Sequence, residues 1–177
     1  GRPRGERDTA GRGDGGTAGR VGQEVRRSVA RAGGLMTGFD AEALALLTEC
    51  RVAHLATIAE DGRPRMVPVC FAAVDGRVVI SHDQKPKRRG ALARFRDIAR
   101  DPRVTLLADR YDDDWTKLAW VRVEGTAEGM PRGEAWPEAV AALRARYRQY
   151  AAMALEETAL MVITPVRVTS WHWGKPR

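Results

Sequence analysis

The densest cationic cluster in the sequence is the run Lys85-Pro86-Lys87-Arg88-Arg89, which follows a predicted strand and opens a predicted helix. Free main-chain N–H groups and the positive end of a helix dipole favour an anion there, and Lys or Arg side chains add charge-assisted hydrogen bonds. Cations in a first helical turn oppose the dipole unless an anion compensates them. The run therefore indicates a phosphate site, with a solvated basic face as the alternative.

A second candidate is the segment Arg65-Met66-Val67-Pro68, where a proline lies inside a run that otherwise predicts a strand. Proline has no N–H to donate to a sheet, so an edge strand or a bulge is the simplest interpretation. The functional alternative is a main chain held open to hydrogen-bond the edge of a planar ring. Both interpretations stay open at the level of sequence.

Tryptophan is unusually frequent, with five residues among only eleven aromatics. Trp171 and Trp173 lie two residues apart on one predicted strand and so share a face. They either pack in a core or dimer interface, or form a wall for a flat ligand. Trp115 follows the acidic run 112–114, which we interpret as a solvated turn because it has no further pattern of cation ligands.

Several kinds of chemistry have no support in the sequence. It contains no Gly-x-Ser-x-Gly, no Walker loop and no His-Glu-x-x-His, which are signals for nucleophilic hydrolysis, nucleotide hydrolysis and zinc proteolysis. The two cysteines and three histidines are scattered without metal-ligand spacing, which predicts no structural metal and fits a reducing cytoplasm. Any catalysis is expected to belong to a bound cofactor.

The net charge of +7 and the isoelectric point near 10.1 suggest a polyanionic partner until the charge is located. Residues 1–35 hold eight basic against four acidic residues and ten of the 18 glycines. This composition predicts a disordered extension, either a flexible arm or a segment upstream of a start at Met36. Residues 36–177 carry a net charge of only +3, and we expect them to form one cofactor-binding domain. Because this net charge is small, a nucleic acid is not expected as a partner. A membrane is not expected either, since no apolar run approaches the length of a membrane span.

Alternating hydrophobicity and turn signals predict six strands and three helices. The strands are expected at 52–59, 65–73, 77–81, 103–109, 118–128 and 159–173, and the helices at 40–50, 87–100 and within 133–152. Asp75-Gly76 predicts a two-residue hairpin, so the first three strands should form a meander. Short antiparallel strands joined mostly by tight turns favour a small closed barrel over a doubly wound sheet.

Two of the predicted helices are amphipathic. The helix at 40–50, capped by Asp40, has an apolar stripe made of Ala43, Leu44, Leu46 and Leu47. The helix at 87–100 places Ala91, Leu92, Phe95, Ile98 and Ala99 on one face, with arginines around the rest.

The order of these motifs resembles a known family. It comprises Leu55-Ala-Thr-Ile-Ala-Glu-Asp-Gly-Arg-Pro64, the Asp75-Gly76 hairpin, Ser81, a basic loop and helix, and Asp101-Pro102-Arg103. This order is similar to the pyridoxamine 5′-phosphate oxidase-like split β-barrel superfamily over residues 40–174. The similarity is greatest to its actinobacterial members that use the deazaflavin coenzyme F420, whose basic helix reads Lys-x-Arg-Asn-Leu-x-x-Asp-Pro-Arg. Residues 94–103 correspond to that pattern, with Asp97 in place of the usual Asn.

The resemblance implies a mainly β protein with helices, a six-stranded antiparallel Greek-key barrel of the FMN-binding split-barrel type. It also implies a homodimer with cofactor sites at the interface. Carried over to this sequence, the site has a ring-facing main chain at Arg65, Met66, Val67 and Pro68, phosphate ligands at Ser81, Lys87, Arg88 and Arg94, and partner-chain aromatics at Trp115, Trp171 and Trp173. Asp97 would repel a phosphate placed beside it.

The function implied by the resemblance is that of a cytoplasmic, F420-dependent oxidoreductase. It would transfer a hydride between the reduced coenzyme and a small molecule, with no protein residue acting as a nucleophile. An FMN-dependent oxidase or reductase of the same superfamily is one alternative. A non-catalytic F420-binding carrier protein is another.

Overall fold

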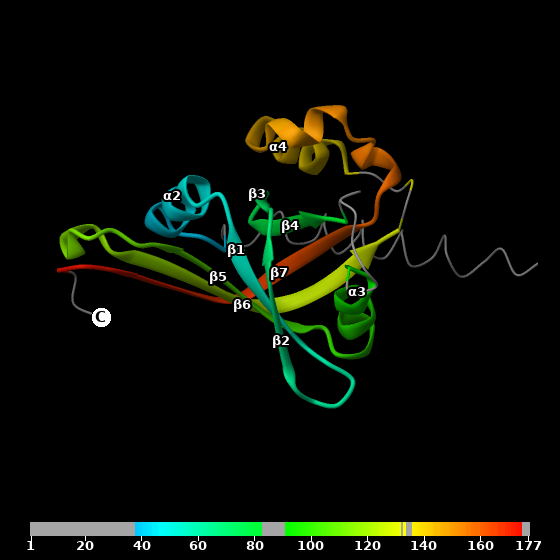
Figure 1. The fold of residues 1–177 in the computed structure, drawn as a ribbon, viewed down its shortest axis with the longest axis horizontal. Helices are drawn as coiled ribbons and strands as arrows, with labels where there is room; N and C mark the ends of the chain where they lie inside the picture. Colours follow the sequence, from blue (N-terminus) through cyan, green and yellow to red (C-terminus); the bar gives the residue numbers. More distant parts are fainter. Residues whose placement is uncertain (1–37, 83–90, 132, 134–135, 175–177) are drawn as a thin grey trace, which may run out of the picture.

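The computed structural model describes residues 38–82, 91–131, 133 and 136–174. The predicted extension at 1–35 and the candidate residues Lys87 and Arg88 lie outside the described residues. The strands form one seven-stranded antiparallel sheet that curls around a core, with helices packed against it (Figure 1). The architecture is the expected one, mainly antiparallel sheet with helices.

The sheet has seven strands rather than the predicted six, in the order β2-β1-β5-β6-β7-β4-β3. Their bounds are β1 Ala53–Ile58, β2 Pro64–Val69, β3 Ala72–Val74, β4 Arg77–Ser81, β5 Arg103–Arg110, β6 Ala119–Met130 and β7 Leu160–His172. The extra strand arises because the predicted strand at 65–73 is interrupted at Cys70 and Phe71. Its first part pairs with β1 and its second part with β4.

The predicted meander of the first three strands is therefore wrong, although the Asp75-Gly76 hairpin within it is confirmed. Both turn residues have positive φ, 48° at Asp75 and 72° at Gly76, as a tight two-residue turn requires. On its other side β4 pairs with β7, from Val78↔Ile163 to Ser81↔Leu160. The chain thus passes from one end of the sheet to the other within two residues, and this short connection forces the sheet to curl.

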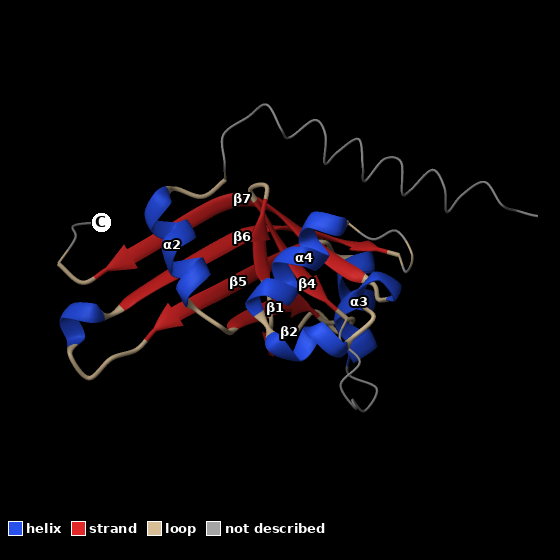
Figure 2. Cartoon of the chain, turned by 90° about the horizontal axis from the view of Figure 1, so that it is seen from above, coloured by secondary structure: helices blue, strands red, loops and turns tan. Residues whose placement is uncertain are grey.

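Helix α2 (Ala41–Glu49) begins as predicted, because the Asp40 carboxylate accepts a 2.7 Å hydrogen bond from the N–H of Ala43. Ala43, Leu46 and Leu47 are buried, whereas Leu44, assigned to the apolar stripe, is exposed. The helix contacts β3, β5, β6 and β7 and so closes one part of the core. In Figure 2 it lies over the long ribbon formed by β5, β6 and β7.

Helix α3 (Ala91–Arg100) is described from Ala91 onward and contacts β1 and β6. Its buried residues include Ala93 and Ile98 but also the charged Arg94 and Asp97, whereas Ala99 is exposed. The prediction that arginines surround the buried face is therefore wrong for Arg94. Two charged groups inside an otherwise apolar packing face need partners, which lie in the strands beside the helix.

Helix α4 (Pro137–Arg146) covers a second apolar cluster, which includes Val79, Leu160 and Val162 from β4 and β7. Ala139, Leu143, Tyr147 and Tyr150 are all buried, as their spacing predicted. The helix ends at Arg146, and the 3-10 helices η3 (Arg148–Ala152) and η4 (Leu155–Glu157) complete the connection. Within the described residues, no helix is both long and apolar enough to span a lipid bilayer.

Candidate functional site

The outer edge of β2 is an unpaired strand edge, since β2 stands at one end of the sheet order. The N–H of Ala59 donates to the carbonyl oxygen of Arg63 at 2.8 Å, so these two residues form a hydrogen-bonded pair at the β1–β2 turn. Bonded and non-bonded pairs alternate along an antiparallel ladder. Pro64, Met66 and Pro68, which pair with Ile58, Ala56 and His54, therefore turn their main-chain groups away from β1.

Because two of these three residues are prolines, this edge carries only one N–H, that of Met66, together with three carbonyl oxygens. The prediction that the proline-containing segment 65–68 belongs to an edge strand is thus confirmed. The main chain is also unpaired on its outer side, as the functional alternative requires. The side chains alternate as well: Arg65 and Val67 are half-buried, whereas Met66 and Pro68 are exposed. The edge offers one donor next to acceptors, so it can both donate a hydrogen bond to a planar heterocycle and accept one from it.

On α3, Arg94 and Asp97 lie three residues apart and so share one face of the helix. The Arg94 guanidinium is buried, with Nη2 3.5 Å from the carbonyl oxygen of Ser81 and with Phe95 beneath it at 5.8 Å. Ser81 itself ends β4. Two of the predicted phosphate ligands, Ser81 and Arg94, are therefore brought together by the fold.

The hydroxyl of Ser81 is buried and lies 3.0 Å from the hydroxyl of Thr158. Thr158 donates its own proton to the carbonyl oxygen of Leu155 at 2.8 Å, so Ser81 is the donor in this pair. Ser81 therefore presents its carbonyl oxygen to Arg94 and directs its hydroxyl proton into the core.

The carboxylate of Asp97 has two partners from neighbouring strands. Its Oδ2 lies 3.0 Å from Nη1 of Arg65 and accepts a 3.0 Å hydrogen bond from the hydroxyl of Thr57. Asp97 is 3% exposed, whereas 37% of the Arg65 side chain remains accessible. The ion pair ties β2 to α3 and places a compensated negative charge one helical turn from Arg94.

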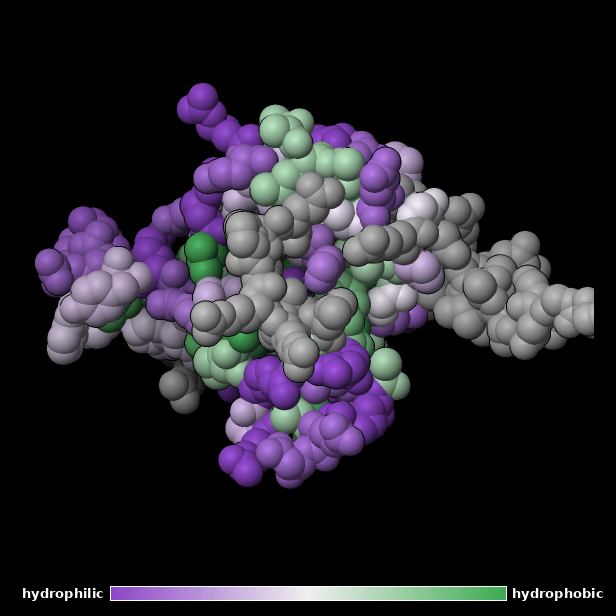
Figure 3. Space-filling model, turned by 45° about the vertical axis from the view of Figure 1, so that its right-hand side comes forward, coloured by the Kyte–Doolittle hydropathy of each residue, from purple (hydrophilic) through white to green (hydrophobic). Residues whose placement is uncertain are grey.

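Hydrophilic residues dominate the surface of this region. Figure 3 shows them over the lower part of the molecule, where the β1–β2 turn and α3 lie. Asp101, which follows α3, accepts hydrogen bonds from the main-chain N–H and the guanidinium of Arg103. These bonds lower the pKa of Asp101 from its ordinary 3.8 to about 2.

Trp171 and Trp173 lie at the C-terminal end of β7, and Figure 1 shows this end of the β5-β6-β7 ribbon far from α3. Trp115 and Trp173 form an edge-on pair with ring centroids 6.4 Å apart, and they are 60% and 47% exposed. Trp171 is half-buried and lies opposite Trp120 in the ladder between β6 and β7. These rings form an exposed aromatic tip, which we define as Trp115, Trp171 and Trp173.

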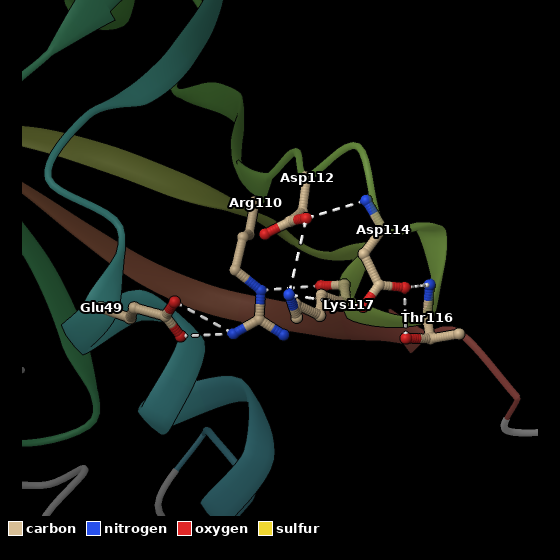
Figure 4. A network of polar contacts seen from close by, with 6 residues as sticks. All are labelled: Glu49, Arg110, Asp112, Asp114, Thr116 and Lys117. Atoms are coloured by element: carbon tan, nitrogen blue, oxygen red, sulfur yellow. Dashed lines mark hydrogen bonds and ion pairs between the residues drawn. The ribbon is translucent and has the colours of Figure 1, made fainter.

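A network of polar contacts stabilises the turn that carries Trp115 (Figure 4). The Asp112 carboxylate accepts from the N–H of Asp114, and the Asp114 carboxylate accepts from the N–H and hydroxyl of Thr116 at the start of η2 (Trp115–Lys117). The Thr116 bonds lower the pKa of Asp114. Arg110 joins the turn to α2 through Lys117 O and the Glu49 carboxylate. The carboxylates of Asp112 and Asp114 thus form hydrogen bonds within their own turn and stabilise it.

The aromatic tip and the Arg94 region cannot meet within one chain. Leu160 pairs with Ser81 at one end of β7, and His172 ends the strand twelve residues later, which corresponds to roughly 40 Å of extended chain. The fold therefore unites Arg65, Ser81 and Arg94 but leaves Trp115, Trp171 and Trp173 remote from them. Sequence reasoning missed the ion pair between Arg65 and Asp97, because the two residues belong to separate elements and no local pattern joins them.

A comparison with protein families shows to which family this chain belongs. Residues 39–172 match the family model for pyridoxamine 5′-phosphate oxidase. The chain belongs to the pyridoxamine 5′-phosphate oxidase family. The matched range runs from the residue before the Asp40 cap to the end of β7, so it includes every element of the site described above.

Several solved structures are similar to this chain. A conserved hypothetical protein from Mycobacterium tuberculosis is 26% identical, with a TM-score of 0.61 over 81% of this chain and 91% of that one. A FAD-binding protein from Mesorhizobium loti is 23% identical, with a TM-score of 0.53 over 75% of this chain and 94% of that one. A heme binding protein from Mycobacterium smegmatis is 22% identical, with a TM-score of 0.60 over 80% of this chain but 56% of that one. The last two show a shared fold.

Proposed function

We propose that this chain binds a flavin-type cofactor between the edge of β2 and α3 and acts as an oxidoreductase, with coenzyme F420 as its cofactor. The observation that carries the proposal is the unpaired edge of β2 beside the cations Arg65 and Arg94. An open strand edge and a phosphate-binding group are the two features that a tricyclic cofactor with a phosphorylated side chain requires. Family membership supports the same role.

The main chain of β2 fits the ring of such a cofactor. Flavins and deazaflavins both end in an imide edge, in which one N–H lies between two carbonyl oxygens. The free edge of β2 presents the Met66 N–H beside carbonyl oxygens, so it could donate to one imide carbonyl oxygen and accept a hydrogen bond from the imide N–H. Met66 and Pro68 would thus hold the ring through main-chain groups, whereas the main-chain groups of Arg65 and Val67, which the resemblance also assigns to the ring, face β1.

The cations beside this edge fit a phosphate. Arg94 would bind it through its buried guanidinium, which the Ser81 carbonyl oxygen and the Phe95 ring help to orient. Lys87 and Arg88 come shortly before α3 in the sequence and would add further positive charge. A buried arginine is a strong phosphate ligand because its planar group donates several hydrogen bonds in a fixed geometry.

The remote position of the aromatic tip supports a homodimer. If Trp115, Trp171 and Trp173 line a cofactor site, they must line the site of a second copy, since about 40 Å of strand separates them from Ser81 in their own chain. Exposed aromatic rings are typical of residues that become buried in an interface.

When bound, the cofactor supplies the hydride chemistry, and the chain's own residues bind and orient it. The β2 edge would hold the ring, Arg94 would hold the phosphate, and the partner's aromatic tip would exclude water from the ring. None of these residues acts as a nucleophile. The substrate is a small molecule that accepts or gives up a hydride.

FMN is the alternative cofactor, because it combines the same imide edge with a phosphate. The FAD-binding protein from Mesorhizobium loti, which shares the fold, favours a flavin in general. A carrier that binds F420 without turnover is the second alternative, and it would use the same residues.

The proposal is tested by titrating the purified protein with F420 and with FMN side by side at low salt, following tryptophan and cofactor fluorescence. We expect micromolar or tighter binding of F420 and weaker binding of FMN. Tighter binding of FMN would select the alternative cofactor, and binding of neither would overturn the proposal. Stoichiometric binding of F420 without hydride transfer to any compound of a broad panel would support the carrier.

A further inference from the structure

We propose that Asp97 sets the charge of the phosphate group that the site accepts, disfavouring a doubly charged phosphate monoester relative to a singly charged phosphate diester. The inference rests on the cofactor site proposed above and assigns a specificity-determining residue within it. It follows from the position of Asp97 in contact with Arg65 and one helical turn from Arg94.

The first observation is that Arg65 already forms an ion pair with Asp97. Its Nη1 lies 3.0 Å from Oδ2 of Asp97, so part of its charge is already compensated by the protein. Because 37% of the Arg65 side chain remains accessible, an anion can approach this arginine from solvent. An anion bound here would therefore interact with both charges, attracted by Arg65 and repelled by Asp97.

The second observation is that Asp97 is fixed. It is 3% exposed, and Thr57 and Arg65 hold it from two strands, so its side chain cannot turn to solvent when a ligand arrives. Arg94, one helical turn earlier, is also buried. Asp97 and Arg94 are thus both held in a rigid frame.

The energetic consequence depends on the charge of the ligand. The interaction of Asp97 with a phosphate is proportional to the phosphate charge, so a dianion is penalised twice as strongly as a monoanion at the same place. The phosphate of FMN is a monoester, which carries nearly two negative charges at pH 8 because the second pKa of such groups is about 6. The phosphate of F420 is a diester with one charge. Asp97 consequently favours F420 over FMN.

The test compares the wild type with Asp97→Asn, which keeps the shape of the side chain and a hydrogen-bond partner for Thr57. Both proteins are titrated at pH 8 and low salt with riboflavin, F420 and FMN. Riboflavin has no phosphate, whereas the phosphate of F420 carries one negative charge and that of FMN about two. We expect no change for riboflavin, roughly threefold tighter binding of F420 and roughly tenfold tighter binding of FMN. The gains should shrink as salt is added.

Two control variants separate charge from structure. Thr57→Val removes the other partner of Asp97 without changing any charge, so it should affect the three ligands alike if it affects them at all. Asp75→Asn changes the net charge by the same amount in the β3–β4 turn, at the other end of β4 from Ser81, and should alter no affinity. Thermal unfolding shows that each variant is folded. Should Asp97→Asn unfold, Arg65→Gln gives the opposite test, with FMN losing more affinity than F420.

The outcomes distinguish the two levels of the proposal. If the wild type and all variants bind none of the three ligands, the proposed cofactor site is wrong and the role of Asp97 falls with it. If the wild type binds but Asp97→Asn changes all three affinities equally or not at all, the site stands and the role assigned to Asp97 is overturned.

Discussion

The hydroxyl of Tyr147 lies 2.9 Å from the amide nitrogen of Phe71 and 2.8 Å from its carbonyl oxygen. Phe71 is one of the two residues that carry the chain from β2 at one end of the sheet to β3 at the other. Its main-chain groups have no strand partner at this crossing, and a single side chain from the end of α4 satisfies both of them. Tyr147 therefore stabilises the point at which the sheet is forced to curl.

We expect Tyr147→Phe to destabilise the protein by about 1–3 kcal/mol, because it leaves buried main-chain groups of Phe71 without a partner. The measurement is urea unfolding followed by tryptophan fluorescence. Tyr111→Phe is the matched control, since Tyr111 is 71% exposed and should lose a few tenths of a kcal/mol at most. Equal effects of the two substitutions would contradict the role of Tyr147.

Gly125→Ala should destabilise the protein strongly. Gly125 lies at the register shift between β6 and β7, where an added Cβ would overlap the carbonyl oxygen of Thr164. Because the obstacle is backbone, we expect a loss of about 2–3 kcal/mol or insoluble expression. Gly129→Ala on the same strand is the control, since its Cβ would lie 3.5 Å from Phe95, an ordinary contact. A tolerated alanine at position 125 would show that the two strands can separate there.

The pKa of Asp101 should be about 2 when measured by carbon NMR, and it should return toward 3.8 in Arg103→Gln. The folded-state pKa lies below the ordinary value, so the stabilisation from this carboxylate is complete above pH 4 and is lost as the pH falls from about 4 through about 2. The pH dependence of stability should accordingly be shallower in this window for Arg103→Gln. An unchanged Asp101 pKa in the variant would refute the assignment to Arg103.

Arg94→Gln should weaken the binding of F420 by at least tenfold, because it removes the buried cation assigned to the phosphate. Arg96→Gln provides the comparison on the same helix, since Arg96 is exposed and should change the affinity less than twofold. Fluorescence titration at two salt concentrations measures both. A similar loss in the two variants would point to general attraction by basic residues rather than to a built site.

The contribution of the partner's aromatic tip can be tested by complementation. Arg94→Gln and Trp173→Ala homodimers should both bind F420 poorly. A mixed dimer of the two variants should recover one intact site, made of Arg94 from one chain and Trp173 from the other. Binding of one F420 per mixed dimer is the expected stoichiometry. No recovery would place both residues in the same chain's site, or Trp173 outside any site.

Sequence reasoning located most elements because their signals are local. Asp40 is a local cap, and Asp75-Gly76 is a local turn. The break at Cys70 and Phe71 has no such signal, since its cause is the curl of the sheet and the remote hydroxyl of Tyr147. The candidate site shows the same division. Arg65 and Arg94 were recognisable as cations, whereas the partner of Arg65 depended on how β2 meets α3, which only the folded chain determines.

The two prolines of β2 have a consequence for the behaviour of the protein in concentrated solution. An unpaired strand edge invites pairing with the edge of another molecule, which is a common route to aggregation. Pro64 and Pro68 remove two of the three N–H groups that a foreign strand would need, and Met66 supplies the third. The edge can therefore remain open to a small ring while resisting extension into an intermolecular sheet.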